Sequence, residues 1–313
     1  MADDPSHPGP SSLAGSSQLA RRRPRLGERR RWADAHRAPG RTRWLAGSGL
    51  PAGRRGMRID RVLANNPGPY TGPGTNTWIL DDGQGVVVVI DPGPVDTRHA
   101  RAIMKTVGRR TVEAVLVTHT HPDHAPMANP LADDLDVPAV GHAPGPHFDP
   151  DIRLLDGADF EVGGLRLEVI HTPGHSDDHL CFRADDVLFT GDHIIGGSSV
   201  MIESLGPYLA SLEKLKGRGL RRLYPGHGDE IDNPEEAIDW YLAHRRQRHH
   251  EILAAIHGGC RNVDDIVEVV YADVDSSLYP LAARSINAHL GLMVEEGQIA
   301  FEGDEIVAPP SPP

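Results

Sequence analysis

Lysine and cysteine are both scarce in this chain of 313 residues. There are three lysines against 29 arginines, and two cysteines, Cys181 and Cys260. Two cysteines cannot build the disulfide framework of a small secreted domain, so we expect free thiols, with Cys181 as an apolar filler in a strand. No apolar run approaches the roughly 18 residues that a membrane-spanning helix requires, and none near the start is long enough for a secretory signal. We therefore expect a cytoplasmic protein without a membrane segment.

Aromatic residues make up only 5% of the chain, but hydrophobic residues reach 39%, enough for the cores of one large domain and one small domain. Residues 1–56 carry a formal charge of +8 and the remaining residues carry −20. The first 56 residues are rich in Ser, Pro, Gly and Arg and have no hydrophobic period, which predicts disorder. They are a basic arm for an anionic partner, an Arg-rich targeting peptide, or the product of a start codon placed upstream of the true start at Met57. We favour the last interpretation.

A cluster of metal-ligand side chains follows the apolar, β-branched run from Val112 to Val117. The segment Thr118-His-Thr-His-Pro-Asp-His124 holds His119, His121, Asp123 and His124. Loops that leave the carboxyl end of a buried strand are where chemistry is usually placed. By chance, such a pattern is expected in roughly one of a few hundred chains of this kind. The segment therefore predicts a metal site.

Three further loops repeat the same arrangement of a strand, a Gly or Pro turn and one ligand-type residue. These residues are His175 after the predicted strand 165–170, Asp192 after the predicted strand 187–189, and His227 after a short apolar run that begins at Leu220. Four such loops at one edge of a sheet predict a centre that holds two metal ions.

These motifs, together with Asp91 in Ile90-Asp-Pro-Gly93, resemble those of the metallo-β-lactamase-fold hydrolases. The resemblance implies that His119, His121 and His175 hold one ion, that Asp123, His124 and His227 hold the other, and that Asp192 bridges the two. It also implies a four-layer αββα sandwich. Ala125-Pro126 departs from the family pattern, which usually has a small residue followed by glycine, so we expect the loop to differ in shape there.

A closer resemblance is to the β-lactamase-like protein 2 group, and it runs from about Met57 to about Phe301. It rests on Asn66-Pro-Gly-Pro69, Gly74-Thr-Asn-Thr77, the segment 172–179 and the segment 224–228. The tail from Ala282 to Ile299 resembles the winged-helix-like end of that group.

The pattern of hydrophobic residues predicts an α/β protein. Helices are expected at residues 97–107, 127–134, 207–216, 234–257, 263–270 and 280–296, and a strand pair at 299–307. We place a catalytic domain at residues 57–233 and a small helical, winged-helix-like domain at residues 234–313. That small domain is expected to pack beside the active site or to form a homodimer contact.

Two metal ions would make a nucleophile from water, because their combined charge favours a bridging hydroxide near neutral pH. We expect two zinc ions, with manganese or iron as alternatives, and we expect Asp123 to orient the hydroxide. Asp91 either holds a ligand imidazole in one tautomer or only forms a turn. His179 either supports a ligand or is a plain strand residue. His193 and Tyr208 are weaker candidates for the site.

The substrate is the least determined feature. The closer resemblance implies cleavage of single-stranded RNA, but a strongly acidic body opposes nucleic-acid binding. RNA would then depend on the Arg-rich N-terminal segment or on Arg245–Arg248, for which we favour a solvated helix face. The alternative is a glyoxalase II-like thioesterase acting on a small ester or thioester, although the glutathione-binding pattern of that family is not apparent.

Three other interpretations are weaker. A β-lactamase would have to be exported, and a persulfide dioxygenase would carry a single iron ion. A metal-sensing protein that binds DNA through its C-terminal domain would need positive charge there, but residues 258–313 hold only two basic residues, Arg261 and Arg284.

Overall fold

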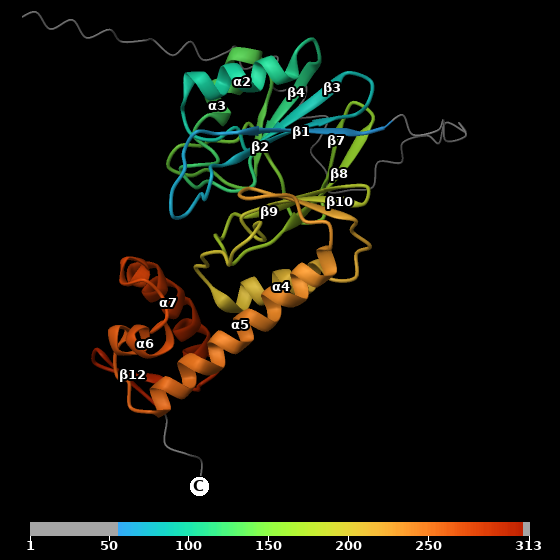
Figure 1. The fold of residues 1–313 in the computed structure, drawn as a ribbon. Helices are drawn as coiled ribbons and strands as arrows, with labels where there is room; N and C mark the ends of the chain where they lie inside the picture. Colours follow the sequence, from blue (N-terminus) through green and yellow to red (C-terminus); the bar gives the residue numbers. More distant parts are fainter. Residues whose placement is uncertain (1–55, 309–313) are drawn as a thin grey trace, which may run out of the picture. The chain divides into compact units, whose positions relative to one another are not determined.

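The computed structural model describes residues 56–308, and all of them belong to one compact unit (Figure 1). The predicted disordered extension lies outside the described residues apart from Gly56. Both cysteines are free, as expected. Within the described part of the chain, no helix is long and apolar enough to cross a membrane.

The first sheet has six strands in chain order, with the first three antiparallel and the rest parallel to β3. They are β1 (Arg58–Leu63), β2 (Asn76–Asp81), β3 (Val86–Ile90), β4 (Thr111–Leu116), β5 (Ala139–Gly141) and β6 (Ile152–Arg153). Helices α2 (Thr97–Val107) and α3 (Ala128–Leu135) cover one face through a buried cluster that includes Val89, Ile103 and Val115. Asp96 begins α2 by accepting a hydrogen bond from the Arg98 amide, as an N-cap residue does.

The second sheet has five strands in the order β11-β10-β9-β8-β7. They are β7 (Asp159–Val162), β8 (Leu165–His171), β9 (Leu180–Ala184), β10 (Val187–Gly191) and β11 (Arg222–Pro225). Trp78 of β2 contacts Phe189 of β10, with ring centroids 6.4 Å apart, so the two sheets pack face to face. Helices α4 (Leu205–Leu215) and α5 (Pro234–His257) cover the outer face. The predicted αββα sandwich is confirmed.

The C-terminal part consists of α6 (Val263–Val270), a short 3-10 turn, α7 (Tyr279–Glu295) and the hairpin β12 (Ala300–Glu302) with β13 (Glu305–Val307). The end of α5 joins them, because Ile252 and Ile256 share a buried cluster with Ile266 and Ile286. Pro234 occupies the first turn of α5, where a missing amide proton costs nothing. The predicted helices 234–257 and 263–270 are confirmed residue for residue.

The interpretation of Arg245–Arg248 as a solvated helix face is wrong for Arg245. This side chain is 2% exposed, donates a hydrogen bond to the Val200 carbonyl, and lies over the Tyr208 ring with its guanidinium carbon 5.3 Å from the centroid. Arg245 follows Ile238 and Tyr241 at helical spacing, so it falls on the buried face of α5.

Stability below neutral pH is expected to depend on His289 of α7. The ring is fully buried, and neither nitrogen has a hydrogen-bond partner. Burial, Arg245 and His249 lower its pKa from 6.5 to about 3. Below pH 6.5 the unfolded chain therefore takes up a proton that the folded chain refuses, and the free energy of unfolding falls by about 1.4 kcal/mol per pH unit from this residue.

Replacing His289 with leucine should remove that slope. The measurement is denaturant unfolding of both proteins from about pH 7.5 to about pH 5. His250→Leu is the matched control, because His250 is a helical histidine that lies exposed on α5. Parallel pH profiles for the wild type and His289→Leu would contradict the prediction.

Candidate metal centre

The four predicted loops meet at one edge of the sandwich. Strands β8, β10 and β11 point in the same direction in the second sheet, so their carboxyl ends lie together. The amide of Leu180 donates to the Thr118 carbonyl over 2.7 Å, which joins the loop after β4 to that edge. The side chains form two groups. They are His119, His121 and His175 in the first, and Asp123, His124, Asp192 and His227 in the second.

The first group is three imidazoles whose nitrogens face one another. His119 Nε2 and His121 Nδ1 are 2.9 Å apart, His121 Nδ1 and His175 Nε2 are 2.9 Å apart, and the third separation is 3.2 Å. Nitrogens bound about 2.05 Å from one tetrahedral zinc ion would be about 3.3 Å apart. Burial and neighbouring imidazoles hold the pKa of His119 well below its usual value, and burial lowers that of His175 to about 4. Neutral imidazoles at this spacing fit a metal ion.

Hydrogen bonds fix which nitrogen of each ring faces the centre. His175 Nδ1 donates to the Met201 carbonyl over 2.6 Å, and His227 Nδ1 donates to the Gly74 carbonyl over 3.1 Å. Because a carbonyl oxygen only accepts, Nδ1 carries the proton, and the lone pair of Nε2 faces the site. Such outer contacts are typical of metal-binding histidines.

Asp91 fixes two further rings in the same way. Its carboxylate lies 3.0 Å from His124 Nδ1 and 2.7 Å from both the amide and the hydroxyl of Thr118. Since that hydroxyl donates to Asp91, it accepts from His119 Nδ1, 3.0 Å away. Asp91 therefore does more than form a turn.

The second group combines carboxylates with imidazoles. Asp123 Oδ2 lies 3.1 Å from His227 Nε2 and 3.3 Å from His124 Nε2. Burial lowers the pKa of His227, but Asp192 and Asp123 outweigh burial and raise it to about 9. Burial raises the pKa of Asp123, but His124 and His227 hold it well below its usual range. The group is therefore arranged around positive charge.

Asp192 lies between the two groups. Its Oδ2 is 3.2 Å from His227 Nε2 and 3.7 Å from His175 Nε2, and its Oδ1 is buried without a hydrogen-bond partner. A buried carboxylate oxygen without a partner is costly unless a cation neutralises it. The Asp192 amide donates to His179 Nε2 over 3.1 Å, and His179 Nδ1 lies 2.9 Å from the Thr172 hydroxyl. His179 thus positions the backbone of Asp192, and the residues fit a pair of divalent ions.

Glycine is required where the loops pass the cluster. A Cβ atom on Gly226 would lie 2.5 Å from Asp192 Oδ1 and 2.7 Å from His124 Cε1. A Cβ atom on Gly174 would lie 2.4 Å from the Tyr208 backbone, and φ there is +129°. The glycine before His175 and the glycine before His227 therefore let each ligand approach closely.

Two weaker candidates are core residues. His193 and Tyr208 are fully buried, and neither lines the cavity at the centre. The Tyr208 hydroxyl donates to the His193 carbonyl over 2.8 Å.

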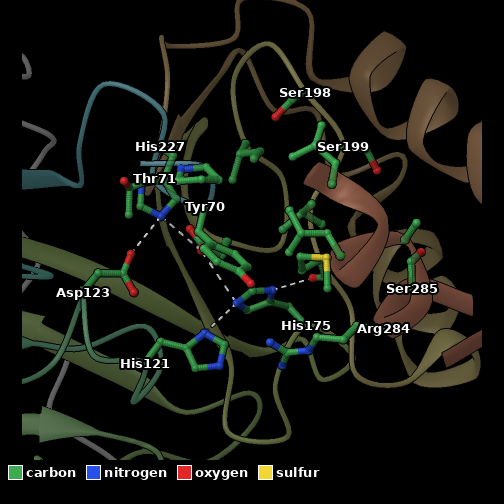
Figure 2. Close-up of a pocket in the computed structure, with 18 of the residues that line it drawn as sticks. Tyr70, Thr71, His121, Asp123, His175, Ser198, Ser199, His227, Arg284 and Ser285 are labelled. Carbon is green, nitrogen blue, oxygen red and sulfur yellow. Dashed lines mark hydrogen bonds and ion pairs between the residues drawn. The ribbon is translucent and has the colours of Figure 1, made fainter. Parts of the chain in front are cut away.

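A cavity of about 870 Å³ opens from the cluster and reaches the C-terminal helices (Figure 2). Tyr70, from the loop between β1 and β2, and Arg284, from α7, both line it. Thr75 donates a hydrogen bond to Asp123 Oδ2 over 3.3 Å. Sequence reasoning assigned none of these three a role in the site; Thr75 entered only as part of a family-like segment.

The chain matches two protein families in turn. Residues 70–227 match the metallo-beta-lactamase superfamily, and residues 263–306 match the beta-lactamase associated winged helix domain.

Relatives of known sequence cover most of the chain. The beta-lactamase-like protein 2 homolog of Drosophila melanogaster is 33% identical over 261 residues, which cover 77% of this chain and 89% of that protein. The atrochrysone carboxyl ACP thioesterase of Cryptosporiopsis sp. (strain 8999) is 31% identical over 268 residues, with coverages of 78% and 82%.

Solved structures share the fold. A metallo-beta-lactamase family protein from Thermus thermophilus superposes with a TM-score of 0.68 at 23% identity, over 80% of this chain and 98% of that chain. A beta-lactamase domain protein from Burkholderia ambifaria gives 0.69 at 21% identity, over 84% and 96%.

Proposed function

The chain belongs to the metallo-beta-lactamase superfamily and is a metal-dependent hydrolase of it, and on that premise we propose that it hydrolyses a small acyl thioester at a centre of two zinc ions. The observation that carries the proposal is the pair of ligand groups joined by Asp192, with its free carboxylate oxygen, at the floor of the cavity. His119, His121 and His175 would hold one ion, and Asp123, His124 and His227 the other. A nitrogen-rich, compact donor set suits zinc.

The bound ions would supply Lewis acidity and a water of lowered pKa. Asp123 lines the cavity, its side chain is 25% exposed, and it stays ionised, so it accepts a hydrogen bond from the attacking water and orients it. Thr75 holds the Asp123 carboxylate from the other side. In the reaction the water oxygen bonds to the acyl carbon, the carbon–sulfur bond breaks, and a water proton leaves with the thiol.

The cavity favours a small acyl substrate over a polynucleotide. Val274, Leu278 and Leu281 give it an apolar wall, whereas RNA binding rests on rows of basic side chains that displace counterions. One relative carries the name of a thioesterase. Among the described residues of the C-terminal domain, Arg261 is held by the Ile256 and Cys260 carbonyls, which also weakens the DNA-binding alternative.

The test uses the full chain loaded with zinc. Butyryl N-acetylcysteamine is offered with a thiol-reactive dye, and a labelled single-stranded RNA is offered in parallel. We expect thiol release that stops on chelation and returns with zinc, and two zinc ions per chain by elemental analysis. Metal-dependent cleavage of RNA without thioester hydrolysis would replace this proposal with the phosphodiesterase interpretation.

A further inference from the structure

Arg284 lies on the wall of the cavity that also holds the metal-ligand cluster. It belongs to α7, its side chain is exposed, and it lines the same cavity as His121 and His175. Figure 2 shows its side chain extending from the helix toward the part of the cavity that these two histidines occupy.

The other arginines of the cavity are already engaged. Arg245 donates to the Val200 carbonyl and lies over Tyr208. Arg248 donates to Glu251 over 2.8 Å and to the Val270 carbonyl over 2.9 Å, and it lies over the Tyr271 ring with 4.7 Å to the centroid. These contacts hold both guanidinium groups to the protein.

Arg284 differs from both. Within residues 56–308 it has no hydrogen bond and no ion pair, and its guanidinium group keeps five free N–H donors. Leu278 and Leu281 of the same segment line the cavity with it. An unpaired planar cation beside an apolar wall suits a ligand that has both an apolar body and an anionic group.

We propose that Arg284 binds an anionic group of the substrate, a carboxylate or a phosphate, and so selects charged acyl thioesters over neutral ones. The inference rests on the proposed thioesterase function. The anion has two possible sources, because a carboxylate would lie on the acyl part and a phosphate on the thiol part. Arg284 does not reach the scissile bond in this role, so its loss should raise KM more than it lowers kcat.

Two pairs of substrates separate the sources. Succinyl and butyryl N-acetylcysteamine differ by a carboxylate on the acyl part, and butyryl 4′-phosphopantetheine and butyryl pantetheine differ by a phosphate on the thiol part. We expect Arg284→Gln to lower kcat/KM by about 10- to 100-fold for the charged member of one pair and to leave its neutral member within about twofold. Arg284→Lys should recover part of the loss, since it keeps the charge but not the fork of donors.

The control variant is Arg101→Gln. Arg101 is also an exposed helical arginine without a partner in the described part of the chain, but it lies on α2 and does not line the cavity. Equal losses for charged and neutral substrates, or no loss, would overturn the inference.

Binding keeps the test decisive if no thioester is hydrolysed. Succinate and 4′-phosphopantetheine are then titrated calorimetrically into the zinc-loaded wild type and Arg284→Gln. Binding weakened by the substitution would support the anion site while the thioesterase proposal fails. Binding that is absent, or that is indifferent to Arg284, would overturn both.

Discussion

Replacing Asp123 with alanine is expected to lower kcat by about 10³-fold, the range found when a group that orients or deprotonates the nucleophile is removed. The carboxylate faces the cavity and lies between His124, His227 and Thr75. Its loss takes away the acceptor that orients the attacking water and one ligand of the second group. The bound zinc should therefore fall from two ions to one per chain.

The measurement combines steady-state thioester hydrolysis with elemental analysis of the dialysed protein. Asp177→Ala is the matched control, because this exposed carboxylate lies two residues after His175 but does not line the cavity. Full activity with two zinc ions in Asp123→Ala would remove Asp123 from the proposed chemistry.

The loops of the centre could be predicted because their signals are local. Each ligand follows a β-branched or apolar run within a few residues, and the carboxyl ends of parallel strands share an edge. Strand and helix bounds moved only slightly: the strand expected at 112–117 is β4 at Thr111–Leu116, and the helix expected at 207–216 begins at Leu205 after Ser204. The assignment of individual ligands to ions remains a proposal.

The contacts that orient the ligands could not be predicted. The acceptors for His175 and His227 are the carbonyls of Met201 and Gly74, which lie 26 and 153 positions away in the chain. A backbone carbonyl has the same chemistry at every residue, so the sequence carries no sign of which one is used.

Arg245 and Arg284 show how charge alone misleads. Both are arginines on helices, and neither was predicted to be part of the site. The burial of Arg245 was readable from its helical spacing with Ile238 and Tyr241, and the charged neighbours obscured that signal. The unpaired state of Arg284 depends on which side chains fold around it, and no spacing along the sequence reports that.

Replacing Asp91 with asparagine is expected to weaken binding of the second ion by about 10- to 100-fold, although the shape of the side chain is kept. If the amide oxygen stays on the Thr118 amide, the new NH₂ group faces His124 Nδ1. That nitrogen must then accept, so the His124 proton moves to Nε2, which points at the site. A protonated Nε2 has no lone pair for a metal ion. In the opposite orientation the NH₂ group faces the Thr118 amide, and two donors oppose each other.

The prediction is tested by zinc titration and by nitrogen NMR of the histidine rings, which reports the tautomer of His124. Asp82→Asn is the control, because Asp82 is also a buried carboxylate that accepts from backbone amides, those of Gln84, Val86 and Gly164. A general loss of stability would follow from either substitution, whereas a change of tautomer with weaker zinc binding should follow only from Asp91→Asn. Wild-type zinc affinity in that variant would mean that Asp91 serves the fold of the loop and not the orientation of His124.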